Sequence, residues 1–266
     1  MRSDELIKAG HLAEAVTALN QEVKDNPEDV RLRTMLFELL CVIGQWERAE
    51  RALAAMAAQS VEIAEGVVVY QKLLQAEAKR RQCLQGAALP KQPVSGAALD
   101  PWLAALKQLA AGGPQAAAAR FAEAETGRRC PTGRRHDADF ADLRDADDRF
   151  AAVLEVLLGE DYLWLPLAAL RTLRVYPPRF LRDVIFAPAM VDWGTGVQPV
   201  FLPVRYPDSE HDTRSEVQLA RRTTTVQGIE APVLGLGQRV FLMDDRQIPL
   251  LELDLVQFTG ERRDAR

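Results

Sequence analysis

The stretch GHLAEAVTAL, residues 10–19, returns in altered form as GQWERAERAL at residues 44–53. The two stretches share a glycine, an alanine and a leucine at an offset of 34 residues: Gly10 and Gly44, Ala15 and Ala49, Leu19 and Leu53. A small residue at the contact between two antiparallel helices lets the helices approach closely. We therefore expect the N-terminal half to be built from repeated pairs of helices.

A period of 34 residues is that of the tetratricopeptide repeat, in which each unit is a helix-turn-helix pair. Pro27 falls where one such unit turns into the next. The glycine, the small residue and an apolar residue reappear two periods after Gly44, at Gly112, Ala117 and Phe121. The sequence predicts two tetratricopeptide-like pairs and a third pair beyond a degenerate unit, although any alanine-rich array of helical hairpins also produces such coincidences.

Individual helices are marked by apolar periodicity. The segment 28–43 carries apolar residues at helical spacing: Leu32, Met35, Leu36, Leu39, Leu40 and Ile43. Asn26-Pro27-Glu28-Asp29 supplies a cap and acids for its start, and Gly44 ends it. Further helices are expected at 61–84 and from Trp102, which follows Asp100-Pro101. The segment QGAALPKQPVSGAAL, residues 85–99, is expected to be a loop between them.

The helix 28–43 also suggests a binding surface. Arg31 and Phe37 lie off its core stripe, and Phe37 is a large apolar residue without an assigned core contact. Interfaces concentrate their energy in a few aromatic or aliphatic anchors, with arginine enriched among them. We therefore predict Arg31 and Phe37 as partner-binding residues. In the alternative interpretation, Phe37 packs under a neighbouring helix.

From about residue 137 the pattern changes to short runs of β-branched and aromatic residues separated by Pro, Gly and Asp. We expect strands in FLRDVIFAPAM, VQPVFLPVRYP and QLARRTTTVQ. The segment 240–256 is expected to form an antiparallel hairpin around Asp244-Asp245, with Leu251, Leu253 and Leu255 on one face. Helices are predicted at 148–158 and about 167–174. The predicted fold is α+β, with a helical repeat domain at 1–126 and a mixed domain with antiparallel strands at 137–260.

The stretch RDADDRFAAVLEVLLG, residues 144–159, contains an acidic cluster of Asp145, Asp147 and Asp148. Aspartate at a helix start satisfies free amide groups and complements the helix dipole, so two of the three acids have a structural role in the expected helix. An enzyme of unknown reaction that uses this cluster is the alternative. The neighbouring Arg144 and Arg149 favour ion pairing over metal binding.

Composition limits the remaining classes of function. The chain of 266 residues is 48% hydrophobic and 27% charged, with a formal net charge of -5. This acidic balance gives no attraction to phosphate backbones or anionic lipid, so neither nucleic acid nor membrane is an expected partner. The sequence shows no apolar run long enough for a membrane span, no signal peptide and no disulfide framework among its 3 cysteines, which predicts a cytoplasmic protein. No spacing typical of a metal site or a nucleotide cofactor is present, and we expect neither a metal nor a cofactor.

Four sequence blocks stand in order over about 120 residues of the C-terminal half: DADDRFAAVLEVLLGEDYLWLP, LRDVIFAPA, FLPVRYPDS and GLGQRVFL with LLELDLVQF. Together these blocks resemble the ImpE family, also called TagJ, of bacterial type VI secretion systems. Where the family resemblance predicts a block like Leu-Gly-Arg-x-Thr-Asp-Trp, this sequence has LARRTTTV. The N-terminal repeats agree with the helical half of the family in a general way.

The resemblance implies a non-enzymatic accessory protein. It implies binding to the small sheath subunit, TssB, and a link to the ClpV-type AAA+ ATPase that recycles the sheath. A general cytoplasmic scaffold for another partner is the alternative. The resemblance also marks motif positions with a structural or a recognition role: Asp145, Asp147, Asp148, Arg149, Trp164, Pro166, Arg182, Asp183 and Arg239. We favour a partly buried ion-pair lattice over a recognition surface, because buried charges need mutual pairing.

Overall fold

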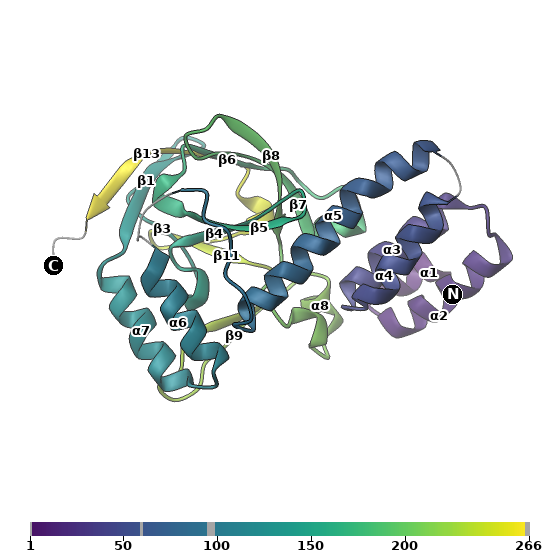
Figure 1. The fold of residues 1–266 in the computed structure, drawn as a ribbon, viewed down its shortest axis with the longest axis horizontal. Helices are drawn as coiled ribbons and strands as arrows, with labels where there is room; N and C mark the ends of the chain where they lie inside the picture. Colours follow the sequence, from purple (N-terminus) through teal and green to yellow (C-terminus); the bar gives the residue numbers. More distant parts are fainter. Residues whose placement is uncertain (1, 59–60, 95–98, 264–266) are drawn as a thin grey trace.

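A computed structural model describes residues 2–58, 61–94 and 99–263 (Figure 1). The N-terminal part is helical: α1 Ser3–Ala9, α2 Leu12–Asp25, α3 Val30–Val42, α4 Trp46–Ala57, α5 Val61–Leu84, α6 Asp100–Ala110 and α7 Pro114–Thr126. Part of the predicted loop 85–99 lies outside the described residues. In the described part of the chain, none of the helices has the length and apolarity needed to span a membrane.

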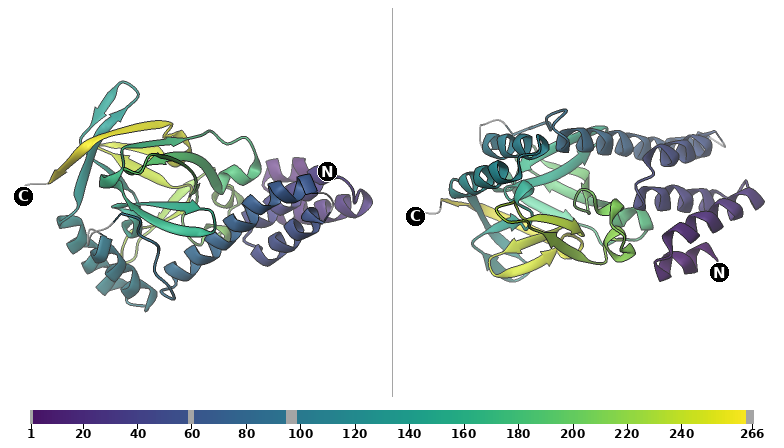
Figure 2. Two further views of the ribbon diagram at one scale, coloured as in Figure 1. Left: turned by 45° about the horizontal axis from the view of Figure 1, so that its top comes forward. Right: turned by 90° about the horizontal axis from the view of Figure 1, so that it is seen from below.

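The repeat residues occupy the contacts between α1 to α4, as predicted. Ala15, Leu19, Ala49 and Leu53 are at most 1% exposed. Asp29 is the N-cap of α3, and its side chain accepts hydrogen bonds from the amides of Arg31 and Leu32. The predicted helix at 61–84 is α5, which extends from the repeats and runs alongside the sheet (Figure 2).

The third predicted pair is formed by α6 and α7, which pack against each other with Ala117 and Phe121 buried. This pair does not continue directly from α4, because the single long helix α5 stands between. A helix of 24 residues measures about 36 Å. The pair α6–α7 therefore lies at the far end of α5, below the sheet (Figure 1).

The C-terminal part is built from antiparallel strands, so the predicted α+β class is confirmed. The largest sheet has eight strands in the order β2-β1-β13-β6-β7-β8-β4-β5. A second sheet has the order β12-β11-β3, and β10 pairs with β9. The strands are β1 Arg129–Arg135, β2 Ala138–Phe140, β3 Leu143–Asp145, β4 Val153–Leu158, β5 Asp161–Pro166, β6 Thr172–Val175, β7 Phe186–Asp192, β8 Val197–Pro203, β9 Thr223–Val226, β10 Leu234–Gly237, β11 Val240–Met243, β12 Arg246–Pro249 and β13 Leu255–Arg263.

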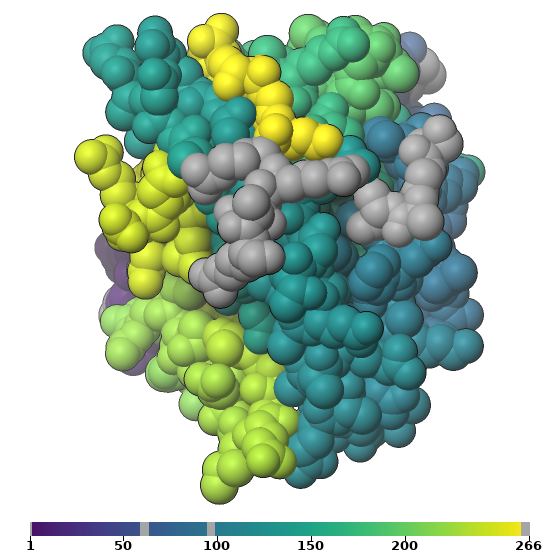
Figure 3. Space-filling view, turned by 90° about the vertical axis from the view of Figure 1, so that its left-hand side faces the viewer, coloured from purple at the N-terminus to yellow at the C-terminus, as the bar shows by residue number. Residues whose placement is uncertain are grey.

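Short helical turns join these strands: η2 Asp148–Phe150, η3 Leu167–Ala169, η4 Leu181–Val184, η5 Ser209–His211, α8 Ser215–Gln218 and η6 Leu250–Glu252. Figure 3 shows the end of the molecule away from the repeats, where the C-terminal strand crosses the upper face and α6 and α7 form the lower right. The hairpin loop between β9 and β10 projects beside these helices.

The predicted helix at 148–158 is wrong. Only Asp148–Phe150 form a helical turn, and Val153–Leu158 form strand β4 between β5 and β8. Residues 153–157 are all buried, because α5 covers one face of β4. A strand buried on both faces has a continuous apolar run, and such a run also satisfies helical spacing.

Two other predicted elements differ from the structure. The predicted helix at 167–174 is the turn η3 followed by strand β6, so it is wrong. The predicted hairpin is correct for β11 and β12 but ends at Pro249. Beyond it, η6 interrupts the chain and β13 joins the large sheet between β1 and β6. The helical turn breaks the period-2 pattern expected for Leu251, Leu253 and Leu255.

The apolar core is shared by the two halves. One cluster of buried residues joins the repeats to the sheet, with Leu39 and Trp46 from the helices and Val153 and Phe186 from the strands. A second cluster lies within the sheets and includes Leu173, Phe241 and Val256. The helical repeats and the strands therefore pack as one body at the level of α5, although the patterns of their sequences differ.

Candidate functional site

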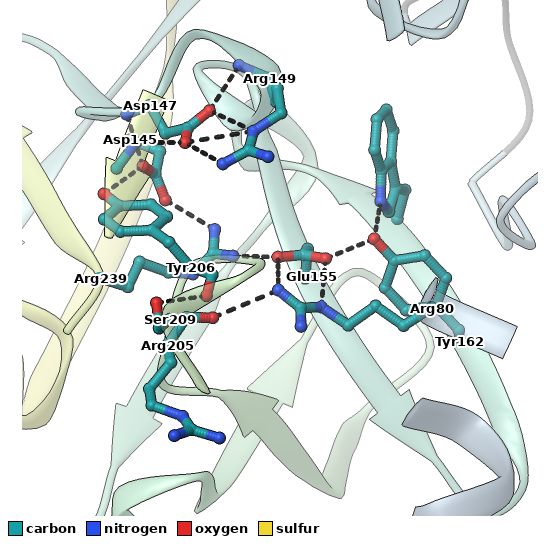
Figure 4. Close-up of polar contacts among 12 residues, drawn as sticks. Arg80, Asp145, Asp147, Arg149, Glu155, Tyr162, Arg205, Tyr206, Ser209 and Arg239 are labelled. Atoms are coloured by element: carbon teal, nitrogen blue, oxygen red, sulfur yellow. Dashed lines mark hydrogen bonds and ion pairs between the residues drawn. The ribbon is translucent and has the colours of Figure 1, made fainter. Parts of the chain in front are cut away.

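Glu155 is the centre of a buried ion-pair network between α5 and the sheet (Figure 4). Its side chain, on β4, is 1% exposed. Arg80 on α5 donates from Nε to Oε1 at 2.8 Å and from Nη2 to Oε2 at 3.2 Å. Arg239 and the hydroxyl of Tyr162 donate to the same carboxylate. Both oxygens of Glu155 are therefore satisfied within the protein.

Arg239 links Glu155 to Asp145, at the end of β3. Its Nη1 donates to Oδ2 of Asp145 at 2.7 Å. The other oxygen of Asp145 accepts the hydroxyl of Tyr206 at 2.7 Å and the amide of Asp147 at 2.8 Å. Asp145 is fully buried and Arg239 is 1% exposed, so this pair depends on its internal partners for solvation.

Asp147 caps the turn η2 and forms the third part of the network. It accepts the backbone amide and the Nε and Nη2 atoms of Arg149, and the amide of Gly235 at 2.7 Å. Asp148 differs from it, because its side chain is 27% exposed. Asp148 accepts Arg144 at 3.0 Å and the amide of Val233 at 2.8 Å. The predicted acidic cluster thus splits into two buried acids and one acid at the surface.

Burial and charge partners act in opposite directions on these carboxyl groups. Burial raises the pKa of Asp145 to about 6, and Arg239 only partly opposes it. For Glu155, burial also raises the pKa, but the combined effect of Arg80 and Arg239 is larger and lowers it. The two arginines therefore hold Glu155 in its charged form.

The network has little capacity for catalysis. A general acid or base needs a polar atom that can reach a substrate, and the carboxylates of Asp145, Asp147 and Glu155 are buried with their oxygens engaged. Within the described ranges, no group of three or more His, Cys, Asp or Glu residues is placed to hold a metal ion. The geometry is that of a structural lattice that orients β3, β4, η2 and α5.

The remaining motif residues lie in two places. Trp164 and Pro166 belong to β5, and Nε1 of Trp164 donates to the Tyr162 hydroxyl at 2.5 Å, which connects this strand to the network. Arg182 and Asp183 belong to η4, where Arg182 pairs with Glu38 of α3. The structure therefore groups Arg182 and Asp183 with the repeats and not with the acidic cluster.

Phe37 has a core role, contrary to the prediction that it faces a partner. It is 2% exposed, and its ring lies 5.8 Å from that of Tyr70 on α5. The alternative interpretation, packing under a neighbouring helix, agrees with this geometry. Arg31 is exposed, with 69% of its side chain accessible, and its Nη2 lies 4.0 Å from Oδ2 of the cap residue Asp29. A solenoid helix packs against neighbours on more than one face, so its core extends beyond a single stripe.

Arg205 and Arg221 connect the C-terminal half to the ends of two repeat helices by hydrogen bonds. Arg205 donates to the carbonyls of Val42 at 2.6 Å and Cys41 at 3.2 Å, at the end of α3. Arg221 donates to the carbonyl of Lys8, at the end of α1, at 3.1 Å. A helix C-terminus carries free carbonyls and a partial negative charge, so both contacts are favourable.

The repeat glycines face the same segment of the C-terminal half. A side chain at Gly44 would place its Cβ 2.7 Å from Cγ of Glu210, and one at Gly10 would collide with Ser215. These glycines permit a close approach, as predicted, but the segment that approaches them belongs to the α+β half and not to the adjacent helix. The turns of both repeats are therefore covered by residues 205–221.

Sequence reasoning missed Arg80, Glu155 and Arg205 as key positions. Each is a buried charge: Arg80 is 5%, Glu155 2% and Arg205 4% exposed. Glu155 stands within the apolar run VLEVLL and Arg205 within FLPVRYP, which is the signal that was available. Arg80 and Glu155 are partners across 75 residues of sequence, and Arg205 reaches the carbonyl of Val42 across 163 residues, so no local pattern identifies these contacts.

Comparison with known proteins agrees with this architecture. Residues 137–257 match the family model described as ImpE protein, and residues 6–66 match a tetratricopeptide repeat model. The type VI secretion system accessory component TagJ of Pseudomonas aeruginosa is 35% identical over 262 residues, which cover 97% of this chain and 91% of that protein. The crystal structure of protein VPA1032 from Vibrio parahaemolyticus superposes with a TM-score of 0.89 at 23% identity, covering 97% of this chain and 98% of the other, and this likeness concerns the fold.

Proposed function

Because the chain belongs to the ImpE family of type VI secretion accessory components, we propose that it is a non-enzymatic adaptor that binds the small sheath subunit. The observation that carries the proposal is the 35% identity with TagJ over nearly the whole chain. In this proposal the adaptor acts in the cytoplasm and assists sheath turnover by a ClpV-type AAA+ ATPase.

The structure supports an adaptor by its helical repeats and by its use of charge. Arrays of helical pairs commonly present surfaces to which a partner helix binds through its apolar face. The buried acids are engaged in internal ion pairs, which leaves them no evident chemical role. Arg31 stays a proposed contact at the rim of the interface, since its side chain is exposed.

Isothermal titration of the whole protein with the purified small sheath subunit tests the proposal. We expect saturable binding. A peptide that covers the binding segment of the subunit should also bind, whereas a shuffled peptide of the same composition should not. The variant Arg31→Glu should weaken binding at least threefold, about 0.7 kcal/mol, because rim charges act mainly on association. Arg51→Glu on α4 is the matched control and should bind as the wild type does. Absence of binding at high micromolar concentration would exclude the sheath subunit as the partner.

A further inference from the structure

A charged pocket lies between the repeats and the C-terminal half. It has a volume of about 270 Å³ and is lined by α4, by the end of α5, by Arg149 and by the loop 207–211. Its acids are Glu47, Glu77, Asp208 and Glu210. Its arginines are Arg80, Arg81 and Arg149. The ion pairs of the buried network do not account for this opening at its edge.

Two of the three arginines of the pocket form ion pairs with carboxylates that do not line it. Arg80 pairs with Glu155, and Arg149 pairs with Asp147 at 2.6 Å. The third, Arg81, stacks over the ring of Trp46 at 5.2 Å. Two of the three cations are therefore held by carboxylates outside the pocket.

The acids of the pocket are less fully paired than its arginines. Among the residues that the structure describes, the side chains of Glu47, Asp208 and Glu210 form no direct ion pair and no hydrogen bond, although the charge of the buried Arg205 attracts Glu210. Glu77 is 4% exposed and meets Arg80 through Oε1 at 3.3 Å, while its Oε2 has no hydrogen bond to any described residue. Burial raises the pKa of Glu77, the charge of Arg80 opposes this rise, and the charge of Glu210 adds to it. A cation placed here would relieve this repulsion.

The residues that line the pocket suit a ligand with a cationic group at the end of an apolar chain. Trp46, Leu84 and Pro207 line the pocket beside the carboxylates. Lysine and arginine bury their apolar stems and present the charge at the tip. The guanidinium group has several donors in a planar fork that matches pairs of carboxylate oxygens.

We propose that this pocket receives an arginine side chain from a protein partner. Glu77 and Glu210 accept the guanidinium group, Glu47 and Asp208 lie at the rim, and the stem packs between Leu84 and Pro207. The inference rests on the proposed function only for the identity of that partner, the small sheath subunit.

The first test uses N-acetylarginine amide as the probe and the whole protein in solution. We expect this probe to shift the indole N–H signal of Trp46 in NMR spectra in a saturable manner. N-acetylcitrulline amide has nearly the same shape without the charge, and it should produce no saturable shift at the same concentrations. Trp193, in the turn between β7 and β8, is the internal control, and its indole N–H signal should not shift. Equal shifts with both probes, or none with either, would overturn the proposal.

Variants of the pocket residues test whether the pocket binds a cation or an anion. The double variant Glu47→Gln with Glu210→Gln should weaken binding of the arginine probe at least fivefold, whereas Glu50→Gln on the same helix α4 should not change it. Arg81→Gln removes a like charge and should strengthen binding. Weaker binding in a folded Arg81→Gln variant would instead indicate an anion site. Thermal melting of each variant verifies the fold.

The sheath subunit then tests the biological assignment. We expect the double variant to bind it at least fivefold more weakly than the wild type does. If both bind it equally, the pocket is not the contact and the adaptor function stands. If the wild type does not bind the subunit, the proposed function fails, and the arginine probe alone decides whether the pocket is a cation site.

Discussion

At the scale of single residues, the main feature is a chain of charges that are buried and paired. Glu155 holds Arg80 and Arg239, and Arg239 in turn holds Asp145. Removing one partner of such a pair leaves the other charge buried without compensation, which typically costs about 3–5 kcal/mol. Replacement of the whole network by apolar residues is a different change, and it is often neutral.

The two neighbouring aspartates allow a matched comparison. Asp147→Asn should lower the free energy of unfolding by about 3 kcal/mol, because it leaves Arg149 buried without a charge partner. Asp148→Asn should cost about 1 kcal/mol, since its side chain is partly exposed. Urea denaturation followed by circular dichroism measures both. Equal costs for the two variants would contradict the buried lattice, and loss of an enzymatic turnover without loss of stability would favour an active site.

The buried carboxyl group of Asp145 should make the stability of the protein depend on pH. Its pKa is about 6 in the folded protein and 3.8 ordinarily, so the folded state binds a proton more tightly than the unfolded state between these values. This carboxyl group therefore favours folding most below pH 4, and its contribution falls by about 3 kcal/mol as the pH rises from about 4 to about 6, above which it stays constant. A carboxyl ¹³C titration should give the raised pKa directly.

The hydroxyl of Tyr206 lowers the pKa of Asp145 through its hydrogen bond. In the variant Tyr206→Phe the midpoint of the Asp145 titration should move above that of the wild type, with a loss of stability of about 1–2 kcal/mol at neutral pH. A wild-type midpoint near 4 would show that Asp145 does not experience this burial.

At the scale of elements, the turn after α3 shows how the repeat is adapted to its neighbour. Gly44 has a φ of 70°, in the left-handed region that favours glycine. Gly112, two periods later, has a φ of 81°. The positions differ in their surroundings: Gly44 lies against Glu210, whereas a Cβ at Gly112 would have no heavy atom within 4 Å.

This difference separates backbone strain from close packing. Gly112→Ala should cost about 1 kcal/mol, which is the conformational penalty alone. Gly44→Ala should cost at least about 1 kcal/mol more, because Glu210 must also move. Chemical denaturation of the two variants is the measurement. A cost at Gly44 no greater than that at Gly112 would mean that the repeat and the C-terminal half separate easily at this turn.

At the scale of the whole molecule, the repeats and the sheets share one apolar core. The cluster that contains Leu39 and Trp46 also contains Val153 and Phe186. Arg205 adds hydrogen bonds from the C-terminal half to the end of α3. A domain whose core is shared with its neighbour does not unfold independently of it.

We therefore expect one cooperative thermal transition. Far-UV circular dichroism, which reports mainly the helices, and near-UV signals of the buried Trp164 should give the same midpoint. The calorimetric and van't Hoff enthalpies should agree. Two resolved transitions would show that the predicted division into 1–126 and 137–260 also holds for stability.

Elements whose signals are local could be predicted from the amino-acid sequence. The buried repeat alanines, the cap at Asp29 and the hairpin at Asp244-Asp245 depend mainly on neighbours in the chain, and the structure agrees with them. The four blocks also indicated the family, because their order along the chain is preserved. These features need no knowledge of which distant segments meet.

The remaining features depend on contacts between segments that are distant in sequence. Whether VLEVLL is a helix or a strand depends on α5, which covers one face of β4 and makes its apolar run continuous. Phe37 and Glu155 acquire their roles from Tyr70 and Arg80, which lie far away in sequence. Burial and ion pairing depend on contacts between distant segments, so composition and periodicity predict that such charges need partners but not which residues supply them.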